Sequence, residues 1–151
     1  MTGGNGTPAI RQRLRVLARY VWASPNTLLG LGIGAIAVAL GARLHAVAGN
    51  LEIGGGLLGR GVARLPAALR FSAITFGHVI LATSRDVLPT LRDHECVHVR
   101  QYERWGILFI PAYLASSLWQ LLHGRSPYWA NHFEKQAFSA APDEPRSHVG
   151  P

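Results

Sequence analysis

The sequence is short of charge and contains almost no cysteine, lysine or methionine. Only 15% of its 151 residues are Asp, Glu, Lys or Arg, whereas 48% are hydrophobic, and an average soluble domain has about a quarter charged residues. This composition excludes a disordered or collagen-like chain and suggests that part of the chain contacts lipid. The single cysteine, Cys96, excludes an internal disulfide and so does not indicate the redox compartment.

Acidic residues are scarcer than basic ones. Fifteen Lys and Arg residues against eight Asp and Glu residues give a net charge of +7, and Lys135 is the only lysine. An excess of this size favours an anionic partner, either lipid headgroups or nucleic acid. Beyond Arg19 the arginines are dispersed and match no nucleic-acid recognition motif, so we expect membrane lipid as the partner and no nucleic acid.

The longest uncharged apolar run is Leu28–Ala42, and with its neighbours it extends over 27–48, about the 20 residues that cross a bilayer. A flexible basic segment, residues 1–26, precedes it. Arginines before the run and glycines within it, Gly30 and Gly34, favour a single-pass helix with a cytoplasmic N-terminus. On this interpretation the rest of the chain lies outside the cytoplasm.

Two other interpretations of this run stay open. A basic start, an apolar core and Ala46-Val47-Ala48 before Gly49 also form the pattern of a cleaved signal peptide, which predicts a secreted protein. The uninterrupted run is shorter than 18 residues, however, so it also fits a buried helix of a soluble cytoplasmic domain.

Residues 49–138 are expected to form an α+β domain, and residues 139–151 a disordered tail. Short strands are predicted around Leu51–Ile53 and over Phe71–Thr83. Three helices follow, over Asp86–Trp105, over Ile107–Leu122, and from Ser126 or Asn131 to Phe138. Asp86 is the expected N-cap of the first, Pro89 fits its first turn, and Gly106 and Gly124 are expected to end the first two.

The first of these helices carries the pattern H-E-x-x-H, as His94-Glu95-Cys96-Val97-His98. Side chains four residues apart lie on one face of a helix, so both imidazoles can bind one metal ion. Glu95 is then placed to take a proton from a water molecule bound to that metal. The pattern predicts a zinc (Zn²⁺) site with His94 and His98 as ligands and Glu95 as general base.

A zinc site needs a third protein ligand, and Glu134 is the best candidate. It lies 36 residues after His98 in the last predicted helix, where the small residue Ala137 lets the helix approach the metal closely. An alternative role for Glu134 is to cap its own helix, because Asn131-x-x-Glu134 is close to a capping box. His123 and His132 are alternative ligands.

Four further residues are weaker candidates. His78, in the middle of the predicted strand, is expected either to line the cleft or to be a satisfied core histidine. Tyr128 is a candidate donor to a developing oxyanion, or an aromatic residue that packs at a helix start. Gln101, three residues after His98, and Asn131, three before Glu134, are expected to support the ligands from outside.

The arrangement of His94, His98 and Glu134 resembles that of gluzincins, in which a Glu from a later helix, often in an E-x-x-A setting, completes a His, His, Glu site. Residues 70–140 also resemble a family of small uncharacterised bacterial proteins that carry H-E-x-V-H-x-x-Q-Y-E-R-W-G. The resemblance implies a zincin-like site, with His94, His98 and Glu134 as ligands and Glu95 as base. One departure is His132, which stands where proline is expected after the asparagine.

These observations predict a minimal zincin-like α+β domain, with short strands, three helices and a central metal-site helix, behind an N-terminal transmembrane or signal-anchor helix. The expected function is a membrane-anchored zinc hydrolase, most plausibly a metallopeptidase acting on a peptide or protein. The alternative is a non-catalytic membrane or partner-binding protein with a structural metal site, since about 90 residues leave little chain for a substrate-binding lobe.

Overall fold

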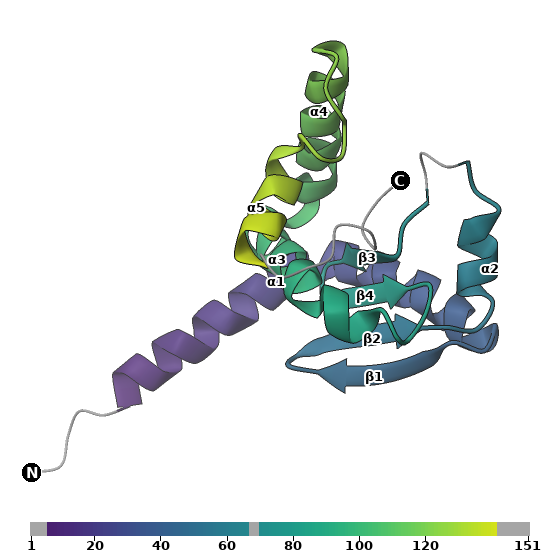
Figure 1. Ribbon diagram of the computed structural model, residues 1–151. Helices are drawn as coiled ribbons and strands as arrows, with labels where there is room; N and C mark the ends of the chain where they lie inside the picture. Colours follow the sequence, from purple (N-terminus) through teal and green to yellow (C-terminus); the bar gives the residue numbers. More distant parts are fainter. Residues whose placement is uncertain (1–5, 67–69, 142–151) are drawn as a thin grey trace, which may run out of the picture.

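The computed structural model describes residues 6–66 and 70–141, and it shows an α+β fold. A small sheet is covered on one face by the long helix α1 (Gly6–Ala39) and on the other by α3 (Leu88–Trp105) (Figure 1). The expected α+β class is therefore confirmed. The C-terminal half of α1 belongs to this layered body, whereas its N-terminal half projects from it (Figure 1).

The sheet has four short strands, which are β1 (Arg43–Val47), β2 (Asn50–Gly54), β3 (Ala73–Phe76) and β4 (Val79–Ala82). Their order is β1-β2-β4-β3, so β1 and β3 form the edges. The central pair β2 and β4 is parallel, and each edge strand is antiparallel to its neighbour. The short helix α2 (Leu58–Ala63) lies between β2 and β3 in the chain.

Strand β4 is buried on both faces because it lies between the two long helices. Val79 and Leu81 belong to the cluster packed against α1, whereas Ile80 and Ala82 pack against α3. Alternate side chains of a strand point to opposite faces, so a strand covered on both sides is continuously apolar. The run Val-Ile-Leu-Ala is the sequence signature of this position.

The single strand expected over Phe71–Thr83 is wrong, because the chain reverses in its middle. Gly77 and His78 form a two-residue turn that joins β3 to β4, with φ +60° at Gly77. A left-handed first turn residue matches the right-handed twist of a hairpin, and glycine adopts it without steric cost. A Cβ at this position would also collide with Thr27 of α1. His78 is therefore a turn residue.

Helix α1 differs from the expected helix over 27–48 at both ends. It begins at Gly6, within the segment expected to be flexible, and ends at Ala39, while residues 43–47 form β1. A Cβ on Gly30 would lie 2.8 Å from the Cβ of Val79, and one on Gly34 would collide with Ile53. The two glycines thus let α1 approach the sheet, a role different from the expected packing between membrane helices.

Pro25 lies inside α1 and removes one hydrogen bond of the helix. Its missing N–H would have donated to the carbonyl of Val21, four residues earlier. The hydroxyl of Ser24 donates to that carbonyl instead, at 2.7 Å. The helix therefore continues through the proline.

The second half of the chain is helical. After α3 come the 3-10 turn η2 (Gly106–Leu108), α4 (Phe109–Leu122) and α5 (His132–Ala140). Gly106, with φ +53°, ends α3 as expected, and Pro89 lies in the first turn of α3. Val87 precedes α3 in place of the expected cap Asp86, whose backbone N–H and side chain both bond to Ser84.

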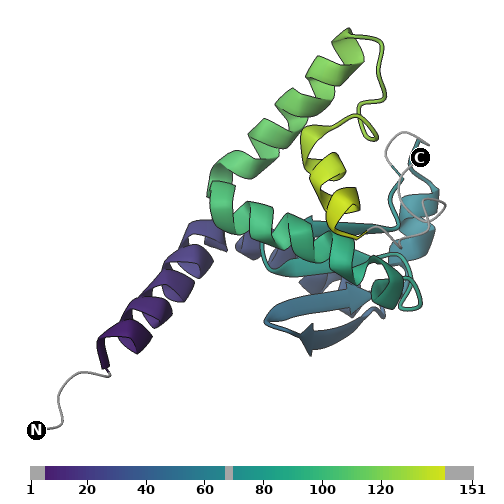
Figure 2. The ribbon, with the colours of Figure 1, turned by 60° about the vertical axis from the view of Figure 1, so that its left-hand side comes forward.

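The start of α5 matches the later of the two predicted positions. Asn131 is its N-cap, and residues 127–130 form turns. Of the predicted tail, residues 139 and 140 belong to α5, and residues 142–151 lie outside the described residues. The turned view shows how α4 and α5 stand against α3 (Figure 2).

Within residues 6–66 and 70–141, two helical stretches are long and apolar enough to cross a membrane, as judged by length and composition. They are Ile10–Ala39, close to the apolar run singled out in the sequence, and Leu88–Leu122, which joins α3 to α4. A core helix or a signal sequence meets the same criterion, and the C-terminal half of α1 packs on the sheet through Ala37 and Ile33.

Candidate metal centre

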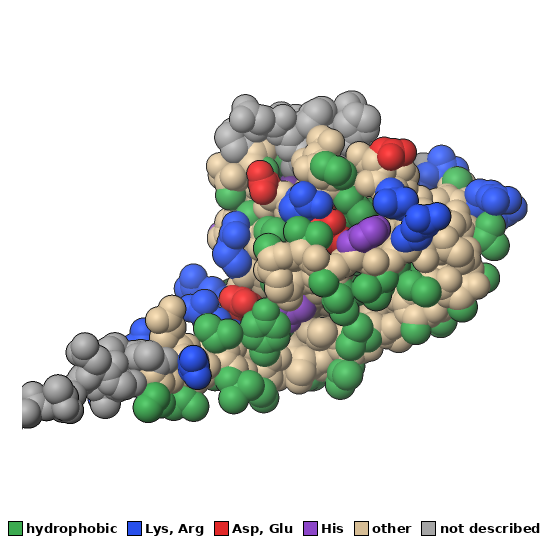
Figure 3. Space-filling model, turned by 90° about the horizontal axis from the view of Figure 1, so that it is seen from below, with side chains coloured by type: hydrophobic (Ala, Val, Ile, Leu, Met, Phe, Trp, Pro, Cys, Tyr) green, Lys and Arg blue, Asp and Glu red, His purple; other side chains and the backbone are tan. Residues whose placement is uncertain are grey.

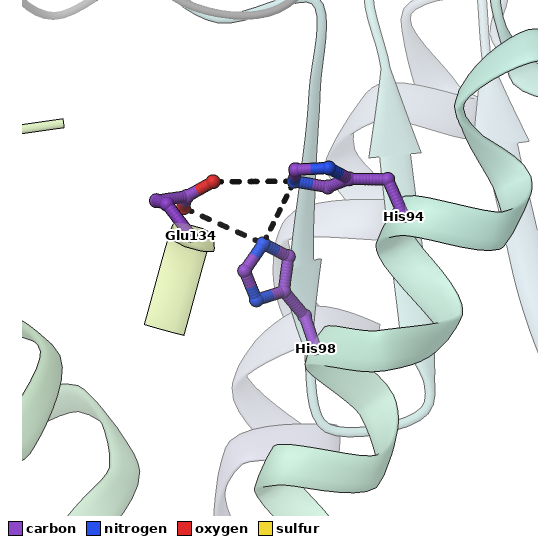
Figure 4. A group of neighbouring side chains, drawn as sticks. All are labelled: His94, His98 and Glu134. Atoms are coloured by element: carbon purple, nitrogen blue, oxygen red, sulfur yellow. Dashed lines mark hydrogen bonds and ion pairs between the residues drawn. The ribbon is translucent and has the colours of Figure 1, made fainter. Parts of the chain in front are cut away.

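Helix α3 brings two imidazole rings to one point. His94 and His98 lie one turn apart, and their Nε2 atoms are 3.1 Å from each other (Figure 4). Both side chains are buried, with His94 only 1% exposed. Two ring nitrogens at this separation, in a place closed to bulk water, are arranged to share one cation or proton.

Gln101 fixes the orientation of the His98 ring. Its amide nitrogen donates to the carbonyl oxygen of Phe133 and to Gln136, both at 3.0 Å. The amide oxygen of Gln101 therefore faces His98, whose Nδ1–H donates to it at 2.8 Å. A neutral His98 then directs the lone pair of Nε2 at the cluster, as a metal-binding histidine does.

Helix α5 supplies the third group, Glu134. Its Oε2 lies 3.2 Å from Nε2 of His94, and its Oε1 lies 3.4 Å from Nε2 of His98. The capping-box alternative does not match these contacts, because the N–H of the cap residue Asn131 donates to the carbonyl of Tyr128. The sequence-predicted ligands are thus brought together.

Asn131 holds the start of α5 in place without touching the cluster. Its side chain accepts a hydrogen bond from the Phe133 N–H and donates to the Tyr113 carbonyl and the Ser117 hydroxyl. These bonds connect α5 to α4 one turn before Glu134. Asn131 therefore positions the helix that carries the carboxylate.

Two tyrosine hydroxyls lie against Glu134. Tyr113 donates to Oε1 at 2.7 Å, and Tyr128 is close enough for the charge of Glu134 to act on its phenol. Burial and the adjacent carboxylate raise the pKa of both phenols, so both stay protonated. Tyr128 thus lies near the cluster, and its role as an oxyanion donor stays a prediction.

Charges within the cluster shift the proton affinities of its members. Burial alone would raise the pKa of Glu134, but the hydrogen bonds from His94 and His98 hold it below its usual range. Burial lowers the pKa of His98, yet Glu134 reverses this effect and raises it. The carboxylate thus favours positive charge between itself and the two rings, and a metal ion can take the place of that proton.

Glu95 is buried on the side of α3 that faces the sheet. Thr75 of β3 donates to its Oε2 at 2.6 Å and so fixes the carboxylate. Burial raises the pKa of Glu95, partly offset by His98 and His94, whose charges act on it. A fixed carboxylate of raised proton affinity beside two imidazole rings has the properties expected of a general base.

The three ligating side chains fit a metal ion. Each of His94, His98 and Glu134 offers one atom, and these atoms lie within 4.8 Å of one another. Zinc–ligand bonds of about 2.0–2.1 Å in a tetrahedron give ligand–ligand distances of about 3.3 Å. The contacts between the three side chains, 3.1, 3.2 and 3.4 Å, are close to this value.

No relative guides the interpretation of this centre. Comparisons with family models, curated proteins and solved structures find no match. The function is therefore argued from the cluster itself, and the zincin-like resemblance stays a prediction.

Three histidines that the sequence indicated as candidate site residues lie away from the cluster. His78 stacks on Tyr20 of α1, with ring centroids 4.0 Å apart, and its Nε2 is 3.5 Å from Glu103. His123 bonds through Nδ1 to the carbonyl of Trp119 at the end of α4. His132 is exposed and contacts Gln136. None of the three belongs to the ligand group found among the described residues.

Tyr113, Thr75 and Phe138 are site residues that the sequence did not indicate. Tyr113 and Thr75 bond to the two carboxylates, and the ring of Phe138 packs on His94 with centroids 4.7 Å apart. Each contact joins elements far apart in the chain, so no local spacing shows it. A polar Thr75 within an apolar strand is the only signal available.

Proposed function

We propose that this protein is a zinc-dependent hydrolase whose substrate is a peptide or protein. The observation that carries the proposal is the meeting of His94, His98 and Glu134 in a buried cluster that also holds Glu95 nearby. Two imidazole nitrogens and one carboxylate form a ligand set that zinc commonly takes in catalytic sites. Such a set leaves a fourth position for water or substrate.

In this proposal three residues of the chain hold the metal ion and a fourth transfers a proton. His94, His98 and Glu134 would hold the ion, which when bound lowers the pKa of a water molecule and polarises a carbonyl oxygen. Glu95 would accept the proton of the water as its oxygen bonds to the carbonyl carbon, and would give that proton to the amine as the C–N bond breaks. Thr75 keeps the Glu95 carboxylate in one orientation during both transfers.

The position of β3 supports a peptide as substrate. β3 is an edge strand of the sheet, and its residue Thr75 contacts Glu95. An edge strand has backbone groups free to pair with an extended peptide, as in strand addition. A peptide bound in this way runs past the carboxylate that would act as base.

The proposal is tested by exchanging Glu95 for glutamine and measuring both zinc content and cleavage of an unfolded protein such as casein. Glu95→Gln should keep its zinc, because Glu95 is not a ligand, and should lose about 10²- to 10⁴-fold in rate, the usual contribution of a general base. Asp93→Asn is the matched control, since Asp93 is an exposed acid on the same helix. The hydrolase proposal fails if the wild-type chain cleaves nothing or if Glu95→Gln retains full activity.

A second candidate function is a non-catalytic protein with a structural metal. It is favoured by the burial of the ligands and by the Phe138 ring that packs on His94, because structural sites are closed and catalytic ones keep an open position. Cobalt-loaded protein distinguishes the two. A small hydroxamate should change the cobalt spectrum if a position is open, and leave it unchanged if the site is closed.

A further inference from the structure

The outer face of α1 carries an apolar stripe that no other described part of the chain covers. Spacings of four, three, four and seven residues place its members on one side of the helix, and each is 59–66% exposed. The stripe consists of Ile10, Leu14, Leu17, Val21 and Leu28. Large side chains in a continuous exposed row mark an interaction surface.

The stripe points away from the body of the protein. From Ala23 onward the opposite side of α1 is buried, and it includes Ala23, Asn26 and Ala37, whereas residues 10–22 are exposed on all sides. Seen from below, hydrophobic side chains follow the lower edge of the molecule from the projecting N-terminal arm onward, and Lys and Arg side chains lie mostly away from that edge (Figure 3). The stripe is therefore exposed along its whole length, although α1 buries side chains only from Ala23 onward.

Charge is distributed around the stripe in a regular way. Helix α1 contains Arg11, Arg13, Arg15 and Arg19 and no Asp or Glu. At 100° per residue, Arg11 and Arg13 flank the stripe on either side, whereas Arg15 and Arg19 lie on the opposite face. An apolar row flanked by arginines is typical of a helix that lies in a membrane interface, where the long side chains reach the headgroups.

A second apolar surface begins where α1 crosses the end of α3. There Trp22 donates to the Arg104 carbonyl and Asn26 to the Gly106 carbonyl, next to the start of α4. Figures 1 and 2 both show α4 and the N-terminal half of α1 standing out from this corner of the body. Helix α4 has no charged residue and exposes Leu114, Leu118, Leu121 and Leu122.

We propose that α1 lies along the surface of an anionic membrane, with the stripe among the acyl chains and Arg11 and Arg13 at the lipid phosphates. The net charge of +7 adds long-range attraction to such a surface. This placement differs from the single-pass span expected from the sequence.

The packing of α1 on the sheet argues for the surface and against a span. Gly30 and Gly34 hold the helix in contact with Val79 and Ile53 of the sheet. If residues 28–39 crossed the hydrocarbon, the strands beside them would enter it too. The unpaired backbone groups of the edge strands β1 and β3 would then have no hydrogen-bonding partner there.

The charge pattern also argues against a second copy of the chain as the occupant of the stripe. Two copies of α1 packed stripe to stripe would bring four arginines together, Arg11 and Arg13 from each copy. The helix supplies no acidic residue to pair with them, so like charges would repel across the contact. Lipid phosphates have the opposite sign.

The test is sedimentation of the full chain with phosphatidylcholine vesicles that contain or lack phosphatidylglycerol. Leu17→Glu, in the stripe, should weaken binding about ten-fold or more, because it removes a leucine from the acyl region. Gln12→Glu is the matched control, since it adds the same charge on the opposite, exposed face of the same helix. Gln12→Glu should change vesicle binding by no more than about five-fold. Arg11→Gln should also stay within about five-fold.

Binding to anionic vesicles that Leu17→Glu abolishes and Gln12→Glu preserves would support the proposal. No binding, equal loss in both variants, or a stripe-dependent dimer that ignores vesicles would overturn it. Cellular protein that resists alkaline carbonate extraction would also overturn it, because a surface helix is released where a spanning one is retained. Zinc content, measured on the same samples, reports separately on the hydrolase proposal.

Discussion

At the scale of single residues, Gln101 explains why His98 can act as a ligand. Its amide nitrogen is committed to Phe133 and Gln136, so its oxygen must accept the proton of His98 Nδ1. This bond leaves the lone pair of Nε2 for the cluster. Such outer partners typically contribute a factor of 10 to 100 to metal affinity.

We therefore expect Gln101→Ala to weaken zinc binding by about 10- to 100-fold, measured by competition with a coloured chelator. Gln136→Ala is the control, because Gln136 bonds to Gln101 but not to a ligand. It should change affinity far less. Equal effects of the two substitutions would show that Gln101 stabilises the fold and does not orient His98.

The sequence indicated the residues that meet at the cluster better than it indicated the side chains that bond to them. His94, Glu95 and His98 follow from helical spacing, which is local, and Glu134 follows from the need for a third ligand. Tyr113 reaches Glu134 from another helix, 21 positions away, and Thr75 reaches Glu95 from a strand. Such contacts depend on how elements pack, which no spacing in the sequence encodes.

At the scale of elements, α1 can approach the sheet because residue 30 is a glycine. Gly32, on the same helix, serves as the comparison. A Cβ on Gly30 would lie 2.8 Å from the Cβ of Val79 and 2.9 Å from the carbonyl oxygen of Phe76. These atoms belong to the paired strands β3 and β4, whose backbone cannot move easily. Gly32 lies half a turn away, and a Cβ added there would have no atom within 4 Å.

Gly30→Ala should lower the free energy of unfolding by about 1–3 kcal/mol, the usual cost of overpacking. Gly32→Ala should raise it by about 0.5–1 kcal/mol, because alanine favours a helix more than glycine does. Urea unfolding followed by circular dichroism measures both. If the two variants were equally stable, α1 would not pack on the sheet as described.

The ends of helices could be predicted where a proline, a glycine or a capping side chain marks them. Pro89 and Gly106 lie near the start and at the end of α3, and Asn131 caps α5. The turn at Gly77 was missed because the apolar run continues through it on both sides. The end of α1 was missed because Leu44 and Ala46 fit a buried helix as well as the strand they form with β2.

At the scale of the whole molecule, a bound metal would connect helix α3 to helix α5. His94 and His98 belong to α3 and Glu134 to α5, 36 residues further along the chain. A metal that binds only the folded state stabilises it by mass action, by about 4 kcal/mol when free metal is a thousand times Kd. Its removal should therefore destabilise the entire domain.

Chelation should lower the melting temperature of the purified protein by about 10 °C under those conditions. Differential scanning calorimetry with and without EDTA gives the shift. Glu134→Ala, which lacks one ligand, should melt at the same temperature in both buffers. A shift of equal size in that variant would place the stabilising ion elsewhere.

The layered arrangement of the molecule could not be predicted from the sequence, although its α+β class could. The run Leu28–Ala42 is apolar on every side. One face of α1 packs on the sheet, and the opposite face is apolar although it is exposed. Such a pattern is also that of a membrane span, so composition alone cannot separate the two. The surface placement proposed for α1 rests on the contacts of Gly30 and Gly34 with the sheet.

The central claim is that His94, His98 and Glu134 form one metal centre, and elemental analysis of the purified full chain tests it most directly. The account predicts one zinc ion per chain in the wild type and in Glu95→Gln, and none in His94→Ala, His98→Ala or Glu134→Ala. A wild-type chain without bound metal, or a Glu134→Ala variant that keeps its zinc, would contradict it.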